Sequence, residues 1–194
     1  MKEKKSMKRL EKAAIHLFSE KGYEATTVRN ICDAIEITPP SLYYYFDSKE
    51  NLYLHVVEQC EQAHRAAVEE AMEACHQVTA EERLGHLFEA LVVFHGKERD
   101  LYEFWLRSFL FPPVSLKSKI QEMTEEWREE YQKMLADFLN NSAADSLPFT
   151  EIIDVLEAFQ KLVLGHILSI STGRTSPSKE KTRHTWNQFW NGIQ

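Results

Sequence analysis

Apolar residues recur along most of this chain at the spacing of one helical face. In the first such segment Leu10, Ala14, Leu17 and Phe18 stand at positions i, i+4, i+7 and i+8, and Gly22 ends the segment. No part of the sequence alternates apolar and polar residues with the period of two that strands require, and no internal repeat is present. The pattern therefore predicts an all-α fold.

Two short helices are predicted next, because capping residues fix where each one begins. Thr26 and Thr27 offer N-cap hydroxyls to a short helix whose inward face carries Val28, Ile31 and Ile35. Thr38 is the N-cap of the following helix, which must start at Pro39, since a proline farther inside would break it, and which runs to about Tyr45. With a supporting helix before it and a long one after, this pair is typical of a helix-turn-helix, placed at about residues 27–46.

The rest of the chain predicts further helices, which brings the expected total to about nine. Cap signals stand at Ser48 and Thr79, and Pro112 ends an apolar segment. A long helix is expected to begin at Ser48 and include Cys60 and His64, and another to begin at Thr79 and include Val92. Further helices are expected to include residues 104–110 and 120–139, and the last two to cover about 148–171 and 178–193, with a loop at 140–146. We therefore divide the chain into an N-terminal three-helix domain, residues 1–50, and a helical domain, residues 51–194.

The net charge of -7 argues against a nucleic-acid binder, but the charge is unevenly distributed. Residues 1–50 hold nine Lys or Arg and eight Asp or Glu, a net charge of +1, so the remainder carries -8. The N-terminal quarter can therefore approach phosphate, whereas the rest of the chain repels it.

Cysteine usage and hydropathy point to the cytoplasm. The three cysteines, Cys32, Cys60 and Cys75, form neither an even disulfide set nor a C-x-x-C pair, and no apolar N-terminal stretch resembles a signal peptide. The most apolar run, 104–111, is far shorter than the roughly 20 residues that span a bilayer. We expect no membrane span and no membrane partner.

The second short helix of the motif carries the candidate DNA chemistry. Small residues at its N-terminal end let the backbone approach base edges, and hydroxyl groups along it bond phosphate oxygens. Leu42 and Phe46 turn back to the core. Lys49, at the start of the next helix, adds a positive charge.

The stretch from Phe18 to Leu52 resembles the signature of the TetR family of bacterial regulators. The matching elements are K-G-Y at 21–23, T-T-V at 26–28, S-L-Y-Y-Y-F at 41–46 and S-K-E at 48–50. The resemblance implies an obligate homodimer that represses by binding double-stranded operator DNA. It also implies release of the DNA when a small-molecule inducer binds the C-terminal domain.

The resemblance further implies which residues meet DNA. The phosphate contacts are expected from Thr27, Thr38, Ser41, Tyr43, Tyr45 and Lys49, while Pro39, Pro40 and Tyr44 are nearest the bases. Glu36 departs from the family pattern, because it stands where the turn usually has Gly, so we expect a positive φ there. Pro40 departs as well, since a small residue is commoner at its position. The two prolines offer no donors, so base readout is expected to be sparse; the alternative is a structural hairpin with packed tyrosines.

The candidate inducer site lies among apolar and aromatic residues of the helical domain, so the inducer is expected to be largely apolar. The candidate residues are Phe104, Trp105, Arg107, Phe109, Trp127, Tyr131 and His166. Arg107 can bind a carboxylate or phosphate on the inducer, or it can pair with Glu103 one turn away on the same helix. The aromatic residues can equally be ordinary core, and His166 a packing histidine.

The last two helices are strongly apolar on one side. Candidate dimer contacts are Leu156, Phe159, Val163, Trp186, Phe189 and Trp190. Packing of these residues within one chain is the alternative.

No other chemistry is expected. Cys60 and His64 stand at i, i+4, but two ligands do not make a metal site, so we expect none. The chain lacks a P-loop, G-x-G-x-x-G, G-x-S-x-G and H-E-x-x-H, so we expect no enzyme and no cofactor. The competing functions are a helical activator and a helical binding protein without a DNA role.

Overall fold

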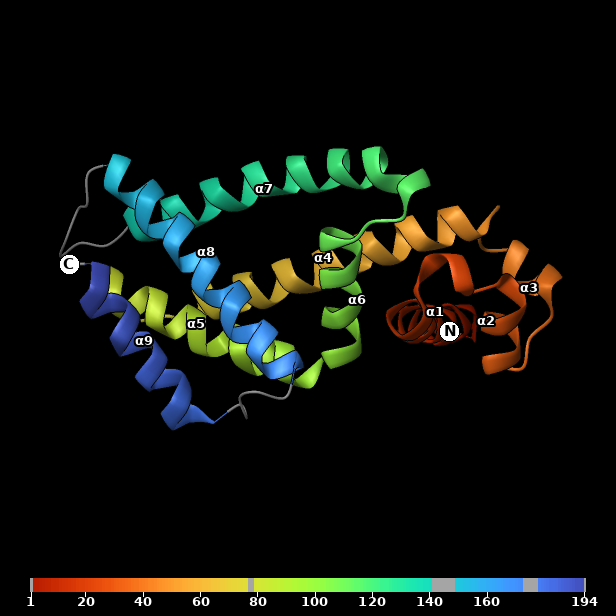
Figure 1. The fold of residues 1–194 in the computed structure, drawn as a ribbon, viewed down its shortest axis with the longest axis horizontal. Helices are drawn as coiled ribbons and strands as arrows, with labels where there is room; N and C mark the ends of the chain where they lie inside the picture. Colours follow the sequence, from red (N-terminus) through yellow and green to blue (C-terminus); the bar gives the residue numbers. More distant parts are fainter. Residues whose placement is uncertain (1, 77–78, 141–148, 173–177, 194) are drawn as a thin grey trace. The chain divides into compact units, whose positions relative to one another are not determined.

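The computed structural model describes residues 2–76, 79–140, 149–172 and 178–193, and the regular structure within these ranges is entirely helical (Figure 1). The α-helices are α1 (Lys2–Ala25), α2 (Val28–Ala34), α3 (Pro39–Tyr43), α4 (Lys49–Glu73), α5 (Ala80–Lys97), α6 (Arg99–Leu110), α7 (Lys117–Asn140), α8 (Phe149–Ser171) and α9 (Lys179–Ile193). A short 3-10 helix, η1 (Val114–Leu116), precedes α7. The predicted all-α fold is confirmed.

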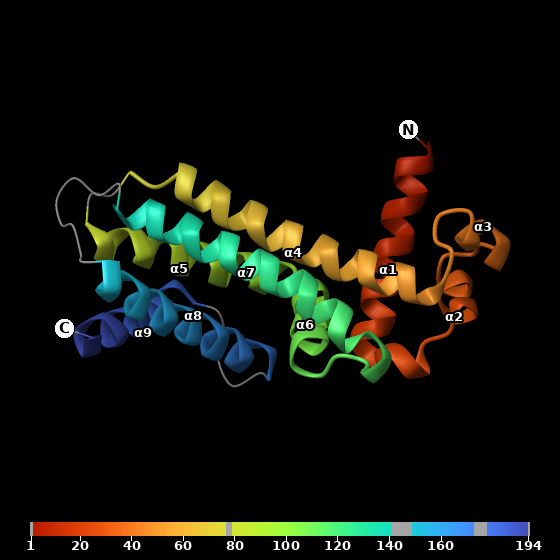
Figure 2. The ribbon, with the colours of Figure 1, turned by 90° about the horizontal axis from the view of Figure 1, so that it is seen from above.

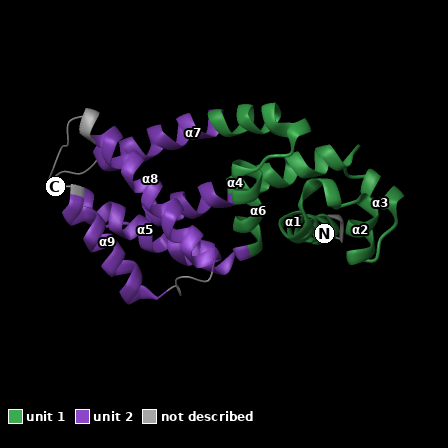
Figure 3. Cartoon of the chain, viewed as in Figure 1, with its two compact units in different colours: residues 1–62, 100–125 green, residues 63–99, 126–194 purple. Residues whose placement is uncertain are grey.

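The chain forms two compact units that do not follow chain order (Figure 3). The first unit comprises residues 1–62 and 100–125, and the second comprises residues 63–99 and 126–194. The predicted DNA-binding domain, residues 1–50, falls inside the first unit, and its boundary at residue 50 stays a prediction.

The first unit is built around the apolar faces of α1, α2, α4 and α6. Figure 2 shows α2 and α3 beside the C-terminal half of α1 and the start of α4. Phe18 of α1 is buried at the centre, with its ring 5.0 Å from that of Tyr53 and 6.1 Å from that of Phe104. Burying such a ring stabilises a fold by about 1.5 to 3 kcal/mol. Because Phe104 of α6 is one of the rings that cover Phe18, α6 belongs to the same core as α1.

The second unit packs α5 against α8 and α9. Phe88, Leu91 and Phe159 are fully buried there. Trp186 of α9 lies against Gly85 of α5, where a Cβ atom would come within 2.8 Å of the indole nitrogen. Gly85 therefore allows α9 to approach α5 closely.

The caps predicted at Ser48 and Thr79 are confirmed. The Ser48 hydroxyl accepts from the backbone N–H of Asn51 at 3.0 Å, and the Thr79 hydroxyl accepts from that of Glu82 at 3.2 Å. α6 ends at Leu110, ahead of Pro112 as expected. The loop predicted at 140–146 lies outside the described residues apart from its first position, which belongs to α7. Within the described ranges, no helix is long and apolar enough to cross a membrane.

Candidate nucleic-acid interface

The C-terminal end of α1 leads the chain into the motif. Gly22 interrupts the helix with a φ of 80° and a ψ of 171°, which confirms the predicted stop and uses a conformation that glycine adopts without strain. The buried Thr26 hydroxyl donates to the carbonyl oxygen of Gly22 at 2.8 Å and lies 3.1 Å from that of Leu17. Thr26 thus satisfies carbonyls that the end of a helix leaves without intrahelical partners.

α2 begins with a reciprocal cap. The Thr27 hydroxyl accepts from the backbone N–H of Asn30 at 3.1 Å, and the Asn30 side-chain oxygen accepts from the backbone N–H of Thr27 at 3.0 Å. Of the two N-cap hydroxyls predicted, that of Thr27 is confirmed, and that of Thr26 is wrong, because the Thr26 hydroxyl is bonded to carbonyl oxygens of α1. The partner role of Asn30 was not predicted, although its position three residues after Thr27 was the available signal.

The turn between α2 and α3 is held from both sides. Glu36 has a φ of 58°, so the positive φ expected there is confirmed. The backbone N–H of Ile37 donates to the Cys32 carbonyl oxygen at 3.0 Å, and Arg9 of α1 donates to the Ile35 carbonyl oxygen at 3.0 Å. These bonds fix the angle between α2 and α3.

α3 presents a compact, exposed face. Leu42 is fully buried, whereas Thr38, Pro39, Pro40 and Ser41 are exposed. The helix starts at Pro39, as predicted, and ends at Tyr43, before the predicted end at about Tyr45. The Thr38 and Ser41 hydroxyls lie 3.0 Å apart and hydrogen bond to each other, so Thr38 does not cap the helix with its side chain. A pair of hydroxyls in this position can donate to a phosphate oxygen.

The tyrosines after Leu42 differ in exposure. Tyr43 is 50% exposed and Tyr44 is 73% exposed, whereas Tyr45 is half-buried with its ring 5.1 Å from that of Tyr44. Large aromatic side chains with this exposure are uncommon on a surface that has no partner. The alternative of a structural hairpin, in which the tyrosines are packed, does not describe Tyr43 and Tyr44.

Lys49 holds the motif to α1. Its ammonium donates to the carbonyl oxygens of Tyr23 at 2.8 Å and Thr26 at 3.1 Å, and it lies 4.0 Å from the centroid of the Tyr23 ring. An ammonium has three donors, so one remains for a phosphate oxygen. The structural role of Lys49 was not predicted, because the sequence does not show that the carbonyl groups of Tyr23 and Thr26 lie near it.

The predicted inducer residues are divided between the two compact units, and Phe104, Trp105, Arg107 and Phe109 belong to the first. Phe104 is buried beside Phe18, and Trp105 stacks on Phe109 with ring centroids 5.6 Å apart. Arg107 donates to the Ser19 carbonyl oxygen at 3.1 Å.

The other three predicted inducer residues belong to the second unit. Trp127 stacks on Tyr131 with ring centroids 4.8 Å apart, and both rings lie within 5.7 Å of His64. His166 packs against Phe88, and its buried Nε2 atom has no hydrogen-bond partner among the described residues. The assignment of these residues to an inducer stays a prediction.

Most of the predicted dimer residues are buried within the second unit of one chain. Leu156, Phe159 and Val163 of α8 and Trp186 of α9 are each less than 9% exposed. Phe189 and Trp190, also predicted for the interface, are half-buried on α9. Their role between two copies stays a prediction.

Cys60 is a buried thiol. The Cys60 thiol lies 3.7 Å from the Leu101 carbonyl oxygen, and burial raises its pKa. Among the described residues, no group of three or more His, Cys, Asp or Glu is arranged to hold a metal ion.

Taken together, two short helices set by a fixed turn, with an exposed hydroxyl and aromatic face, define a DNA-binding protein of the helix-turn-helix class. Residues 10–56 match the family described as bacterial regulatory proteins, tetR family. These residues therefore form a DNA-binding domain of the TetR type.

The curated relatives share this domain. The chain is 51% identical over 47 residues to the biofilm operon icaADBC HTH-type negative transcriptional regulator IcaR of Staphylococcus epidermidis. The match covers 24% of this chain, which spans only 25% of the length of that relative. The likeness is therefore confined to the N-terminal domain.

Solved structures share the whole fold. A TetR-like transcriptional regulator from Rhodococcus sp. RHA1 has a TM-score of 0.71 at 19% identity, covering 96% of this chain and 94% of that chain. The transcriptional regulator FadR from Bacillus subtilis in complex with stearoyl-CoA has a TM-score of 0.67 at 16% identity, covering 96% and 97%. The predicted architecture, an N-terminal helix-turn-helix followed by a helical domain, is confirmed.

Proposed function

We propose that the chain is a homodimeric transcriptional repressor that binds operator DNA and releases it when a small molecule binds the helical domain. The observation that carries the proposal is the exposed face of α3, held in position by Arg9 at the turn and by Lys49 at the end of α1. A rigid helix with exposed hydroxyl groups suits the major groove of DNA. The staphylococcal relative, named a negative regulator, supports repression over activation.

The DNA contacts are assigned by chemistry. Thr38, Ser41 and Tyr43 donate hydroxyl hydrogens to phosphate oxygens, and the third donor of Lys49 adds a charged contact. Thr27 and Tyr45 flank this group, and Pro39, Pro40 and Tyr44 lie against the bases. Because the prolines carry no N–H, they read bases through apolar contact, such as with a thymine methyl group.

Dimerisation supplies the affinity that one domain lacks. The first fifty residues carry a net charge of only +1, so a single copy gains little from phosphate attraction. Two linked copies raise the effective concentration of the second domain at its half-site. We assign the interface to α8 and α9, at the partly exposed surface of α8 around Gly165 and along Phe189 and Trp190 of α9.

A ligand in the helical domain provides release. The Bacillus subtilis neighbour of the same fold is solved with stearoyl-CoA, which supports a ligand with a large apolar part. A ligand that binds the DNA-free form better than the DNA-bound form weakens DNA binding by that ratio of affinities. The regulator would act in the cytoplasm, where operator DNA and the inducer meet.

The test is binding to the DNA upstream of the chain's own gene, followed by gel shift over a range of salt concentrations. We expect a shift at low salt that weakens steeply as salt rises, because phosphate contacts release counterions. If purified protein leaves this DNA unshifted at low salt, the repressor proposal fails.

Paired variants locate the contacts. Ser41→Ala combined with Tyr43→Phe removes two hydroxyls and no charge, so we expect affinity to fall about tenfold with an unchanged salt slope. Tyr23→Phe makes the same chemical change away from the α3 face and should leave affinity unchanged. Lys49 is left intact in this test because it also holds α1. Equal affinity of the double variant and the wild type would contradict the α3 assignment.

A further inference from the structure

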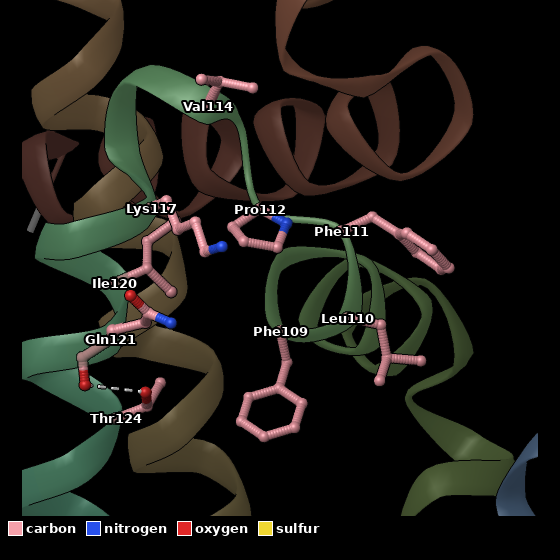
Figure 4. Close-up of a pocket in the computed structure, with 9 residues that line it drawn as sticks. All are labelled: Phe109, Leu110, Phe111, Pro112, Val114, Lys117, Ile120, Gln121 and Thr124. Atoms are coloured by element: carbon pink, nitrogen blue, oxygen red, sulfur yellow. Dashed lines mark hydrogen bonds between the residues drawn. The ribbon is translucent and has the colours of Figure 1, made fainter.

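A pocket of about 510 Å³ lies within the first compact unit, between the C-terminal end of α6 and the first turns of α7 (Figure 4). This volume lies in the range of pockets that hold small molecules, about 300 to 1,000 Å³. The candidate inducer residues of the sequence include one residue of this pocket, Phe109. The other residues that line the pocket have no role in the helix-turn-helix or in the proposed DNA contacts.

The walls of the pocket are largely apolar and accessible. Phe109 is 49% exposed, and in Figure 4 its ring extends from α6 into the space that faces Ile120 of α7, with Pro112 on the segment that follows α6. The Phe109 ring stacks on Trp105 with an interplanar angle of 3°, which holds it in place. At the rim, Phe111 is 76% exposed. Apolar surface left open in this way gains free energy when a ligand covers it.

The polar lining has one sign of charge. Lys117 is the charged residue among those that line the pocket, and no acidic residue lines it. Among the described residues Lys117 forms no ion pair, whereas Lys119, two residues along α7, is paired with Glu50. The Lys117 side chain extends toward Pro112 across the pocket (Figure 4).

Two further features favour an anion at this end of the pocket. Lys117 belongs to the first turn of α7, where the helix dipole places partial positive charge. Gln121 stands one turn later and carries amide hydrogens that can donate to the same anion. The Thr124 hydroxyl is not needed, because it donates to the Gln121 carbonyl oxygen at 3.1 Å.

We propose that this pocket binds a small amphipathic anion, a carboxylate on an alkyl or aryl body. The carboxylate pairs with Lys117 and accepts from the Gln121 amide, and the apolar body covers Phe109, Pro112 and Ile120. The occupant is a single small molecule because the space is concave and carries one unpaired cation rather than an extended charged surface. The pocket can bind this ligand whether or not the chain binds DNA. Its role as the inducer site rests on the proposed function.

α6 provides the route from the pocket to the DNA-binding helices. Arg107, two residues before Phe109, donates to the Ser19 carbonyl oxygen of α1, and Phe104 packs on Phe18 of the same helix. A ligand wedged against Phe109 therefore displaces a helix that is bonded directly to α1. Both ends of this route lie in the first compact unit.

Calorimetric titration with three probes tests the ligand class. Octanoate, octanol and octylamine share one alkyl chain and differ in the charge at its end. We expect octanoate to bind with a Kd of about 0.1 to 1 mM, octanol about fivefold more weakly, and octylamine more weakly still. Equal affinity for octanoate and octanol, tighter binding of octylamine, or no saturable binding of octanoate would each overturn the proposal.

Matched variants test the place of binding. Lys117→Gln should remove the fivefold preference for octanoate over octanol, while Lys119→Gln, which removes the same charge outside the pocket, should keep it. Gln121→Trp should fill the space and abolish binding of both probes, with an unchanged far-ultraviolet circular dichroism spectrum. If octanoate binding survives Lys117→Gln and Gln121→Trp unchanged, the ligand occupies a different site and the pocket assignment is wrong.

A separate readout keeps this result apart from the DNA proposal. Octanoate is added to the gel shift at saturating concentration, and loss of the shift in wild type but not in Gln121→Trp, which blocks octanoate binding, identifies the pocket as the inducer site. A chain that binds octanoate but never shifts its upstream DNA refutes the repressor proposal and leaves the pocket assignment standing.

Discussion

Arg107 of α6 donates a hydrogen bond from Nη1 to the carbonyl oxygen of Ser19 in α1, at 3.1 Å. The Nη2 atom of the same guanidinium lies where a Cβ atom on Gly22 would come within 2.9 Å of it. Ser19 stands in the last turn before the interruption at Gly22, so its carbonyl is one that the helix leaves without an intrahelical partner. Arg107 of α6 therefore caps a carbonyl group near the end of α1. This role differs from the two predicted for it, an inducer contact and an ion pair with Glu103.

Replacing Arg107 should loosen this junction. Arg107→Met keeps most of the side-chain length and removes the donors, so we expect the free energy of unfolding to fall by about 1 kcal/mol. Urea denaturation followed by circular dichroism measures the change. Arg29→Met, on the exposed side of α2, removes a guanidinium that has no such bond and should change stability little. An equal effect of the two variants would show that the Ser19 bond contributes nothing.

The turn of the motif holds strain that glycine would relieve. Glu36 has a φ of 58°, a region that costs a residue with a Cβ atom roughly 1 kcal/mol. Its side chain is exposed, so removing that side chain sacrifices no packing. We therefore expect Glu36→Gly to stabilise the chain by about 0.5 to 1 kcal/mol in thermal or urea unfolding.

A glycine placed inside α2 is the control for this prediction. Asp33→Gly also removes an exposed acidic side chain, but it stands in a regular helix, so it should destabilise by about 0.5 to 1 kcal/mol. Opposite signs for the two substitutions support strain at Glu36. Destabilisation by both would mean that the turn tolerates Glu36 without cost.

The sequence predicted the local features of the motif and missed the long-range ones. Thr27 as a cap, the stop at Gly22 and the positive φ at Glu36 each depend on a few neighbouring residues, so periodicity and turn chemistry are sufficient to find them. The bonds from Lys49 to Tyr23 and from Arg107 to Ser19 join residues distant in the chain, and nothing at either position marks the partner. Tertiary packing alone brings these groups together.

The candidate ligand residues of α6 differ in their surroundings for the same physical reason. Phe104 and Phe109 both belong to α6, yet one faces the core and the other faces the pocket. Aromatic residues at helical spacing look alike in the sequence whether they fill a core or line a cavity. The sequence did not predict a binding role for Lys117, because exposed lysines are common on protein surfaces. Only its apolar neighbours in the pocket distinguish it from other lysines, and the sequence does not show which residues these are.

The histidine pair of the second unit should make stability depend on acid. His64 stacks on His95 with ring centroids 5.2 Å apart. Burial lowers the pKa of His64 to about 4, and burial followed by the proximity of His64 lowers the pKa of His95 as well. The unfolded chain takes up protons at these residues near pH 6.5, before the folded chain does. The folded chain therefore keeps its full free energy of unfolding above about pH 6.5, where both histidines are neutral. This free energy falls as the pH decreases toward 4, because the unfolded chain then binds protons that the folded chain does not.

Urea unfolding at pH 7 and at pH 4.5 measures this loss. For His64 alone the difference should be about 2 to 3 kcal/mol, because each unit of pKa shift is worth about 1.4 kcal/mol. His64→Phe keeps an aromatic ring and removes the proton site, so the difference between the two pH values should shrink. His184→Phe, at an exposed position of α9, should leave the difference as in the wild type. A difference that stays unchanged in His64→Phe would assign the acid sensitivity to other groups.

The open surface of α8 provides the sharpest test of dimerisation. Apart from the surrounding turns of α8 itself, a Cβ atom placed on Gly165 meets no atom of the described residues within 4 Å, so there is room for a larger side chain in a single copy. Glycine in a helix is otherwise unfavourable by about 1 kcal/mol, and a second helix approaching closely would explain why it stands there.

Gly165→Trp should therefore block association while each chain stays folded, and sedimentation equilibrium should then report the single-chain mass of 22.7 kDa. Gly165→Ala should be tolerated, and Glu89→Trp, on the exposed side of α5, should leave the dimer intact. If affinity for DNA depends on two linked domains, as the proposed function requires, Gly165→Trp should also weaken the gel shift without touching α3. A dimer that survives the substitution would place the interface away from this surface.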